Sequence, residues 1–378
     1  MRVALVTNNH LPPREGIGRH VIELAKRLPM HGIEPVVLAK GRNLRFWQRL
    51  AVEGVPVALY PYAPVRPFHQ EAIRAVLQPW LDQGAEGAEL LHLHLPLLPG
   101  LRTRLPRLVT FHSPLLADVA AIREPGLLPA MIKTNARLFG QVYEHAQIKA
   151  ASAIIAVSGN VDAELRRHYR LGGRRPLVIP NGVDVDFFAP PETATLSERP
   201  TVLYVGRLGY RKGLGRLIAA MARLAGRPDW RLALAGEGPL EAALKAEAEA
   251  QGLADRVDFL GFLGRSALRR ALHESALFVN PADYESGPLT LLEAMAAETP
   301  VVTTPTGLVQ DFDRPAPLLV AEPDPTALAA AIGTVLADPV AATARAARAR
   351  VLVAERFAWD SVAASTAALY QSLARQAA

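Results

Sequence analysis

The chain has 378 residues, of which half are hydrophobic and 21% are charged. This length suits two domains of ordinary size, each with enough apolar residues for a core, and the composition excludes a largely disordered protein. The chain has no cysteine, which excludes disulfide scaffolds, thiolate zinc sites, iron–sulfur clusters and a cysteine nucleophile. The longest apolar run, residues 90–101, is too short for a membrane span, and the N-terminus lacks a signal-peptide pattern. A cytoplasmic location is therefore expected.

The first half of the chain is basic. Residues 1–185 carry 23 Lys and Arg against 14 Asp and Glu, whereas the remainder carries 19 against 22. Such a balance serves nucleic acid, anionic lipid or an anionic substrate. The segment Lys40–Arg49 combines four cations with Phe46 and Trp47, which suits an anionic membrane surface. A helix with a packed aromatic face is the alternative for this segment.

The first half reads as a series of short apolar strands that alternate with helical stretches. It opens with a strand at Val3–Thr7, followed by a polar loop and a helix at Gly18–Leu28. Such a series predicts a parallel sheet covered by helices on both faces. Further strands are expected at Glu34–Ala39, Pro56–Tyr60, Leu90–His94, Leu108–Phe111, Ala153–Val157 and Leu177–Ile179.

The second half repeats this plan. Its strands are expected at Thr201–Val205, Arg231–Ala235, Val257–Leu260, Leu277–Asn280, Pro300–Thr304 and Leu318–Ala321. Its helices are expected at Leu214–Ala225, Leu240–Gln251, Ser266–Glu274, Pro288–Ala297, Pro325–Leu336 and Ser361–Ala378. We therefore expect an α/β protein with two doubly wound, Rossmann-like domains at 1–185 and 201–357, a linker at 186–200 and a C-terminal helix at 358–378. The default ligand site is the cleft between the domains, beyond the carboxyl ends of the strands.

A basic loop follows the first strand of the second half. It runs Val205-Gly206-Arg207-Leu208 and ends in Arg211-Lys212-Gly213. Arg207 and Lys212 lie in a loop that leads into a helix, and a diphosphate needs fixed positive charge beside the free N–H groups of a helix N-terminus. The sequence therefore predicts a diphosphate site here. The plain alternative is a basic, solvated loop.

Two carboxylates eight residues apart flank a predicted helix start. Glu285 lies in the loop before the helix, and Glu293 lies in its second turn if Pro288 is the first helical residue. A carboxylate can accept two hydroxyls of a ribose or hexose. On their own, these residues could equally be a surface acid and a partner of the helix dipole.

Together these motifs resemble the retaining family 4 glycosyltransferases. The resemblance is carried by Tyr204–Gly213, Leu234–Pro239 and Asn280–Thr303, and in the first half by Pro12–Leu28, His92–His94, Thr110–His112 and Ile179–Asp184. It covers nearly the whole chain. It implies the GT-B fold, two facing Rossmann-like domains whose last helix, after Phe357-Ala358-Trp359, returns to the first domain.

The resemblance also implies roles for individual residues. Arg207 and Lys212 would bind and neutralise the donor diphosphate, and Glu293 would hold the ribose. Glu285 and His112 would lie at the donor sugar. The donor-binding set implied is Gly16, Arg207, Lys212, Gly287, Leu289, Thr290 and Glu293, and the catalytic set is His112, Glu285, Arg207 and Lys212. His92 and His94 are interpreted as structural, and Asn181 and Gly182 as a turn.

Two positions depart from the family pattern. Glu15 stands where the family has the first of two adjacent glycines, and a carboxylate there must point away or pair with Arg14 or Arg19. Pro288 has no N–H and removes one backbone donor to the sugar. These departures put the donor sugar in doubt more than the nucleotide.

The expected function is thus retaining transfer of a hexosyl unit from a nucleotide-diphosphate sugar to a glycan or lipid-linked acceptor, in bacterial polysaccharide or lipopolysaccharide assembly. The Asp-x-Asp pairs of the sequence, Asp184/Asp186 and Asp311/Asp313, lie outside the basic loop and the Glu285–Glu293 motif, so no metal and no cofactor are expected at the leaving diphosphate. The expected location is cytoplasmic, with peripheral contact to the inner leaflet. The alternatives are a GT-B sugar-nucleotide epimerase, a catalytically silent sugar-nucleotide binder and, on basicity alone, a nucleic-acid binder.

Overall fold

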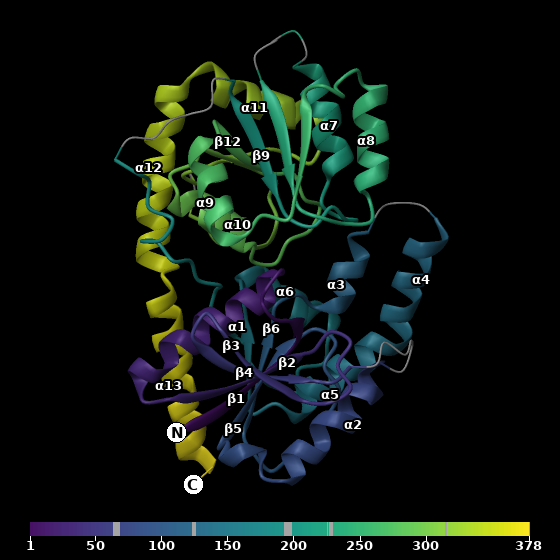
Figure 1. Cartoon of the computed structure of the whole chain (residues 1–378), viewed down its shortest axis with the longest axis vertical. Coiled ribbons are helices and arrows are strands. Elements are labelled where there is room, and N and C mark those ends of the chain that lie inside the picture. Colours follow the sequence, from purple (N-terminus) through teal and green to yellow (C-terminus); the bar gives the residue numbers. More distant parts are fainter. Residues whose placement is uncertain are drawn as a thin grey trace. The chain divides into compact units, whose positions relative to one another are not determined.

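The chain folds into two compact units. Unit 1 contains Met1–Ala120, Glu124–Gly182 and Trp359–Ala378, and Val183–Ala358 makes up almost all of unit 2. The C-terminal helix therefore belongs to the unit that the N-terminus begins. Of the linker expected at 186–200, residues 193–198 lie outside the described part. The computed structural model describes residues 1–62, 69–122, 126–192, 199–224, 226, 230–313 and 316–377 (Figure 1).

Unit 1 is built on an eight-stranded sheet with the strand order β3-β4-β2-β1-β5-β6-β7-β8. Strands β5 and β6 are buried along their whole length, which explains why most of their residues are apolar. The strands expected in the first half are confirmed to within three residues at either end. The strands of the sheet, of which only β3 was not expected, are β1 (Arg2–His10), β2 (Glu34–Lys40), β3 (Gln48–Val52), β4 (Val55–Tyr60), β5 (Leu90–Leu95), β6 (Arg107–Phe111), β7 (Ala153–Ala156) and β8 (Leu177–Val178).

The edge strand β3 is a departure from the expected parallel sheet. It pairs antiparallel with β4 through a two-residue turn at Glu53-Gly54, and both turn residues have positive φ. Such a turn matches the twist of a hairpin. Within the segment Lys40–Arg49, residues 41–47 form a largely exposed loop between β2 and β3, so the helix considered for this segment is wrong. Phe46 is 81% exposed and Trp47 is 37% exposed.

Helices cover both faces of this sheet, and the first and last of them are neighbours. Helix α13 packs against α1, where Arg27 Nε donates to Asp360 Oδ1 at 2.8 Å. The chain's beginning and end thus cover the same part of the sheet. The helices of unit 1 are α1 (Gly16–Arg27), η1 (Leu28–His31), α2 (His69–Asp82), η2 (Ala85–Gly87), α3 (Leu115–Ala120), α4 (Leu127–Asn135), η3 (Ala136–Gly140), α5 (Gln141–Ala150), α6 (Gly159–His168) and α13 (Trp359–Ala377).

Unit 2 is a six-stranded parallel sheet with the order β11-β10-β9-β12-β13-β14. Its strands confirm the expected ones: β9 (Thr201–Val205), β10 (Arg231–Ala235), β11 (Val257–Gly261), β12 (Leu277–Asn280), β13 (Val301–Thr303) and β14 (Leu319–Val320). Its helices are α7 (Leu214–Arg223), α8 (Glu241–Ala250), α9 (Arg265–Glu274), α10 (Leu289–Ala296), η4 (Gly307–Asp311), α11 (Pro325–Ala337) and α12 (Pro339–Arg356).

Each sheet has one place where the strand order reverses. In unit 1 this switch lies between β1 and β5, and in unit 2 it lies between β9 and β12. In open α/β sheets, ligands bind beyond the carboxyl ends of the strands at such a switch. Functional side chains are therefore expected at the carboxyl ends of the strands beside these two switches.

No single described helix is long and apolar enough to cross a membrane. Helices α11 and α12 reach the required length and hydropathy only when taken together, and they meet at an angle of 102°. Helix α12 was not expected from the sequence.

Candidate functional site

The switch of unit 2 is shaped by close backbone approaches at glycines. A Cβ on Gly236 would lie 1.9 Å from the carbonyl oxygen of Gly206, and a Cβ on Gly213 would lie 2.0 Å from that of Pro281. Both glycines also have positive φ, +144° and +66°. Only glycine fits these positions. They let the loop after β9 pack closely on the loops that follow β10 and β12.

This packing brings Lys212 and Glu285 together. Lys212 Nζ lies 2.5 Å from Glu285 Oε1, and the side chains are only 15% and 16% exposed. Burial lowers the pKa of Lys212, and the positive charges of Arg211 and Arg207 lower it further, while Glu285 opposes this shift. Lys212 is thus a cation held in a partly dehydrated place by a single neighbouring carboxylate.

Two arginines share the same loop. The side chain of Arg207 is exposed, and no ion pair to it occurs among the described residues. Arg211 has a positive φ of 67°, and its guanidinium lies 5.6 Å from the ring of Tyr284. Burial lowers the pKa of Arg211. Because three cations stand within one short loop, this loop can accept a ligand with several negative charges.

The N-terminus of α10 adjoins this basic loop through Glu285. The helix starts at Leu289 with Pro288 as its cap, so the expectation that Pro288 is the first helical residue is wrong by one position. No side chain caps this end, which leaves the first-turn N–H groups, including those of Leu289 and Thr290, free for an anion. Glu293 follows in the second turn and is half-buried.

The loop that carries Glu285 is held from behind by η4. A Cβ on Gly307 would lie 2.3 Å from the carbonyl oxygen of Glu285, and Leu308 N–H donates to the Ser286 carbonyl at 3.1 Å. Tyr204 on β9 supports the opposite side, because its hydroxyl donates to the Arg207 carbonyl at 3.1 Å. Burial and the charge of Glu285 raise the pKa of Tyr204. The side chains of the site are therefore placed by backbone on both sides.

In unit 1, Gly16 is exposed at the first position of α1. Glu15 caps the helix by position but not by its side chain, which accepts a hydrogen bond from Asn9 Nδ2 at 2.6 Å. Arg19, one of the two partners expected for Glu15, pairs instead with Glu23 and Glu53. The carboxylate of Glu15 thus lies beside the N-terminus of α1 and is hydrogen-bonded to the neutral side-chain amide of Asn9.

Four histidines meet at the switch of unit 1. His92 and His94 lie on one face of β5, His112 follows β6, and His20 comes from α1. His92 has a hydroxyl partner on each ring nitrogen, Tyr370 at 2.6 Å and Thr110 at 2.7 Å. Its partners fix the ring between the sheet and α13.

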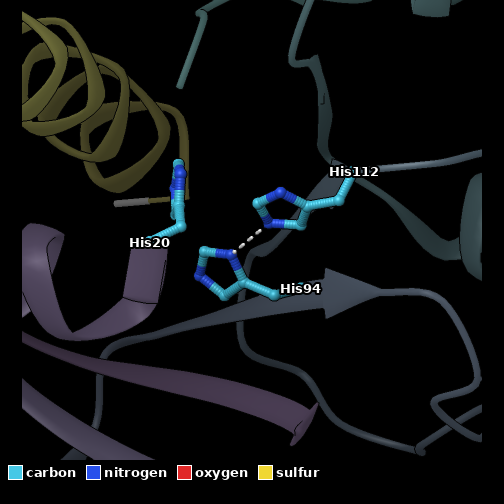
Figure 2. A group of neighbouring side chains, drawn as sticks. All are labelled: His20, His94 and His112. Atoms are coloured by element: carbon cyan, nitrogen blue, oxygen red, sulfur yellow. Dashed lines mark hydrogen bonds between the residues drawn. The ribbon is translucent and has the colours of Figure 1, made fainter. Parts of the chain in front are cut away.

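The other three form a tight group, the histidine cluster (His20, His94 and His112), shown in Figure 2. His94 Nδ1 and His112 Nε2 lie 3.1 Å apart, and His20 Nδ1 lies 2.9 Å from Asn181 Oδ1. The three side chains are at most 7% exposed. Burial lowers the pKa of His20 to about 4 and those of His94 and His112 well below the usual value, so all three rings are neutral near pH 7.

The structure brings some of the expected residues together. Arg207, Lys212 and Glu285 gather at the switch of unit 2. Gly287 lies just before the adjoining helix α10, and Leu289, Thr290 and Glu293 lie in its first two turns. Gly16 and His112 lie in unit 1, beside the ends of β1 and β6. Sequence reasoning gave no site role to Arg211, Tyr204 or His20. The only feature of the sequence that could have indicated a site role for Arg211 is its place next to Lys212 in the basic motif.

Two family models together match most of the chain. The model of "Glycosyltransferase Family 4" matches residues 14–187, and that of "Glycosyl transferases group 1" matches residues 187–351. Glycogen synthase of Mycobacterium tuberculosis is 29% identical over an alignment that covers 99% of this chain and 95% of that protein.

Solved structures show the same fold. Sucrose-phosphate synthase from Thermosynechococcus elongatus superimposes with a TM-score of 0.81 at 25% identity, over 98% of each chain. HepE of Anabaena, in complex with UDP and glucose, superimposes with a TM-score of 0.74 at 18% identity, over 98% of this chain and all of the other. The expected GT-B architecture, with two Rossmann-like parallel sheets and C-terminal helices, is confirmed.

Proposed function

Since the chain belongs to the family 4 glycosyltransferases, enzymes that use a nucleotide-sugar donor, we propose that it transfers a hexosyl unit from a nucleotide-diphosphate sugar to a glycan or lipid-linked acceptor with retention of configuration. The observation that carries this proposal is the meeting of Lys212, Arg207 and Arg211 with the uncapped N-terminus of α10 at one sheet switch. A departing diphosphate develops negative charge, and fixed cations with helix N–H groups stabilise that charge.

The acids beside this loop take different roles in the proposal. Glu285 touches Lys212, so it lies where the diphosphate meets the sugar and faces the positive charge that develops on the sugar ring. Glu293 lies one turn deeper in α10 and holds the ribose hydroxyls. Gly287, Leu289 and Thr290 supply backbone contacts to sugar and phosphate.

In unit 1, Gly16 admits the diphosphate to the N-terminus of α1, because it adds no side chain there. His112 faces the donor sugar and is neutral, so its ring can exchange a hydrogen bond with a hydroxyl. In this proposal the leaving phosphate accepts the acceptor's proton, and the protein's own cations neutralise the diphosphate without a divalent ion.

The acceptor is proposed to be a glycan or lipid-linked saccharide of bacterial polysaccharide or lipopolysaccharide assembly. Support comes from the segment Lys40–Arg49, where the exposed side chains of Phe46 and Trp47 lie among arginines. Exposed aromatics beside cations suit an anionic bilayer surface. The protein would then work in the cytoplasm and attach peripherally to the inner leaflet.

A thermal-shift series with UDP, ADP and GDP tests the donor site. A nucleoside diphosphate at 100 times its dissociation constant should add about 2.7 kcal/mol to the free energy of unfolding. Lys212→Ala should lose most of this stabilisation, because a charge-assisted contact contributes about 1.5–3 kcal/mol. Lys245→Ala is the matched control, since Lys245 is exposed and pairs only with Glu241 on α8 among the described carboxylates. The proposal fails if no nucleotide stabilises the protein, or if both variants respond as the wild type does.

A catalytically silent sugar-nucleotide binder is the second candidate, and it is favoured by Pro288. As the cap of α10, Pro288 offers no N–H to the sugar. Such a protein would be stabilised by a sugar nucleotide yet release no free sugar or nucleoside diphosphate from it. Detection of released nucleoside diphosphate with wild type, absent from Glu285→Gln, would exclude this candidate.

A further inference from the structure

We propose that the histidine cluster binds a divalent transition-metal ion, with Zn²⁺ as the best fit. His20, His94 and His112 each place a ring nitrogen within 4.8 Å of those of the other two. They arrive from α1, from β5 and from the end of β6, so the fold and not local sequence assembles them (Figure 2). Three neutral imidazoles with an open fourth position form the ligand set of many zinc sites.

The spacing fits a metal ion. Zinc–nitrogen bonds of about 2.0–2.1 Å in a tetrahedron place the ligand nitrogens roughly 3.3 Å apart. His94 Nδ1 and His112 Nε2 are already 3.1 Å apart, where the metal-free protein holds a single shared proton. An ion between these nitrogens would replace that proton. His20, whose ligand nitrogen lies within 4.8 Å of those of His94 and His112, completes the set.

The protonation of His20 is also suitable. Asn181 Oδ1 accepts a hydrogen bond from His20 Nδ1 at 2.9 Å, so the lone pair of His20 is on Nε2. A carbonyl acceptor on the far nitrogen is the usual arrangement of a metal-binding histidine, because it fixes the tautomer and the ring orientation. The cluster thus has both ligands and a supporting partner.

His94 offers Nδ1 to the ion and keeps its ring proton on Nε2. Its Nε2 is buried and has no hydrogen-bond partner in the described part of the chain. Because the ion would bind Nδ1, this Nε2 is not itself a ligand atom, and the metal site consists of the three facing ring nitrogens. By contrast, the neighbouring His92 uses both ring nitrogens and has no coordination left to offer.

Softness of the ligands selects the metal class. Imidazole suits Zn²⁺, Co²⁺, Ni²⁺ and Cu²⁺, whereas Mg²⁺ and Ca²⁺ need oxygen ligands. The expectation of no metal was drawn from the lack of an Asp-x-Asp cluster at the diphosphate, which says nothing about histidines in unit 1. Because the ion would occupy Nε2 of His112, it would block that ring and inhibit sugar transfer. This last consequence rests on the proposed function.

Titration of the full chain with Co²⁺, followed by visible absorption, tests binding without any substrate. We expect one equivalent to give the intense bands of four-coordinate Co²⁺, and Zn²⁺ to abolish them. His94→Gln and His20→Gln should each weaken binding by at least about 10-fold, the effect of losing even an outer partner. His10→Gln is the control, since His10 is exposed on β1, and it should bind as the wild type does. Equal affinity in the wild type and both cluster variants, or no such bands in the wild type, would overturn the proposal.

Asn181 provides a second test that does not remove a ligand. Asn181→Asp keeps the acceptor and should retain or tighten binding, whereas Asn181→Leu should weaken it by about 10- to 100-fold. Thermal unfolding of each metal-free variant shows whether it folds. Inhibition of transfer by Zn²⁺, reversed by a chelator, then tests the link to His112. If Co²⁺ binds but Zn²⁺ leaves transfer unaffected, the metal site stands and the role given to His112 falls.

Discussion

The Lys212–Glu285 pair should make a measurable, non-additive contribution to the stability of unit 2. At an effective dielectric constant of about 20, opposite charges about 4 Å apart attract by roughly 4 kcal/mol. Desolvation offsets part of this, as the lowered pKa of Lys212 indicates, and the side chains are 15% and 16% exposed. We therefore expect a coupling energy of about 2 kcal/mol in a double-mutant cycle of Lys212→Met and Glu285→Gln.

Urea unfolding is the assay, and Trp230 is a suitable reporter. Trp230 is 1% exposed, and the sequence has no other tryptophan between 183 and 358. When the protein is labelled with fluorotryptophan, the fluorine NMR signal of Trp230 therefore reports the unfolding of unit 2 alone. Each single variant should lower the midpoint by roughly 1 M, and the double variant should be little worse than either single one.

The matched control is the pair of Lys245 and Glu241, also a lysine and a glutamate but 51% and 38% exposed. Its cycle should give no more than about 0.5 kcal/mol, as exposed helix pairs do. If the Lys212 and Glu285 cycle gives a coupling no larger than this control, the pair is no more than a solvated contact and the reasoning is wrong.

Three further predictions concern other parts of the molecule. Glu293→Gln should raise the KM for donor and erase the disadvantage of a 2′-deoxyribose donor, whereas Glu285→Gln should lower kcat more than it raises KM; identical profiles would contradict these roles. Arg42→Glu with Arg45→Glu should abolish salt-sensitive binding to anionic liposomes but leave transfer to a short soluble acceptor intact, and a wild type that ignores such liposomes at low salt would refute the membrane hypothesis. Burial raises the pKa of Glu144 from 4.5 to about 7, so its stabilising effect is complete below pH 4.5 and is lost as the pH rises to 7, about 3 kcal/mol in all. Glu144→Gln should flatten that part of the stability profile, and an unchanged slope would disprove the assignment.

The sequence predicted best where one physical rule acted alone. The strands of unit 2 were placed closely because each is a short apolar run between turn residues, and β9 and β10 coincide with the expected ranges. Arg207, Lys212 and Glu285 could be found because glycines and a helix start surround them in the sequence. The ion pair of Lys212 and Glu285 could not be predicted, because it depends on the contact between the loops that follow β9 and β12.

Two features escaped for a different reason. Strand β3 is polar and exposed at the sheet edge, so it has neither an apolar run nor a clear alternation. The histidine cluster joins His20 to His94 and His112, which lie 74 and 92 positions further along the chain. No periodicity within α1 reveals that His20 is the polar residue that faces the sheet. Contacts between histidines so far apart in the chain follow from the order of the strands in the sheet, and the local sequence pattern carries no information on that order.

The return of α13 to unit 1 has a consequence for how the chain is made. Tyr370 is fully buried and bonds to His92 on β5, so the core of unit 1 closes only when the last helix has been synthesised. Unit 2 is nearly continuous in sequence, and its residues are inserted between those of unit 1. During translation, domains fold as units once they are complete. Unit 2 can thus finish before the unit that was begun first, and the nascent sheet of unit 1 waits, with part of one face uncovered, for the 19 residues of α13.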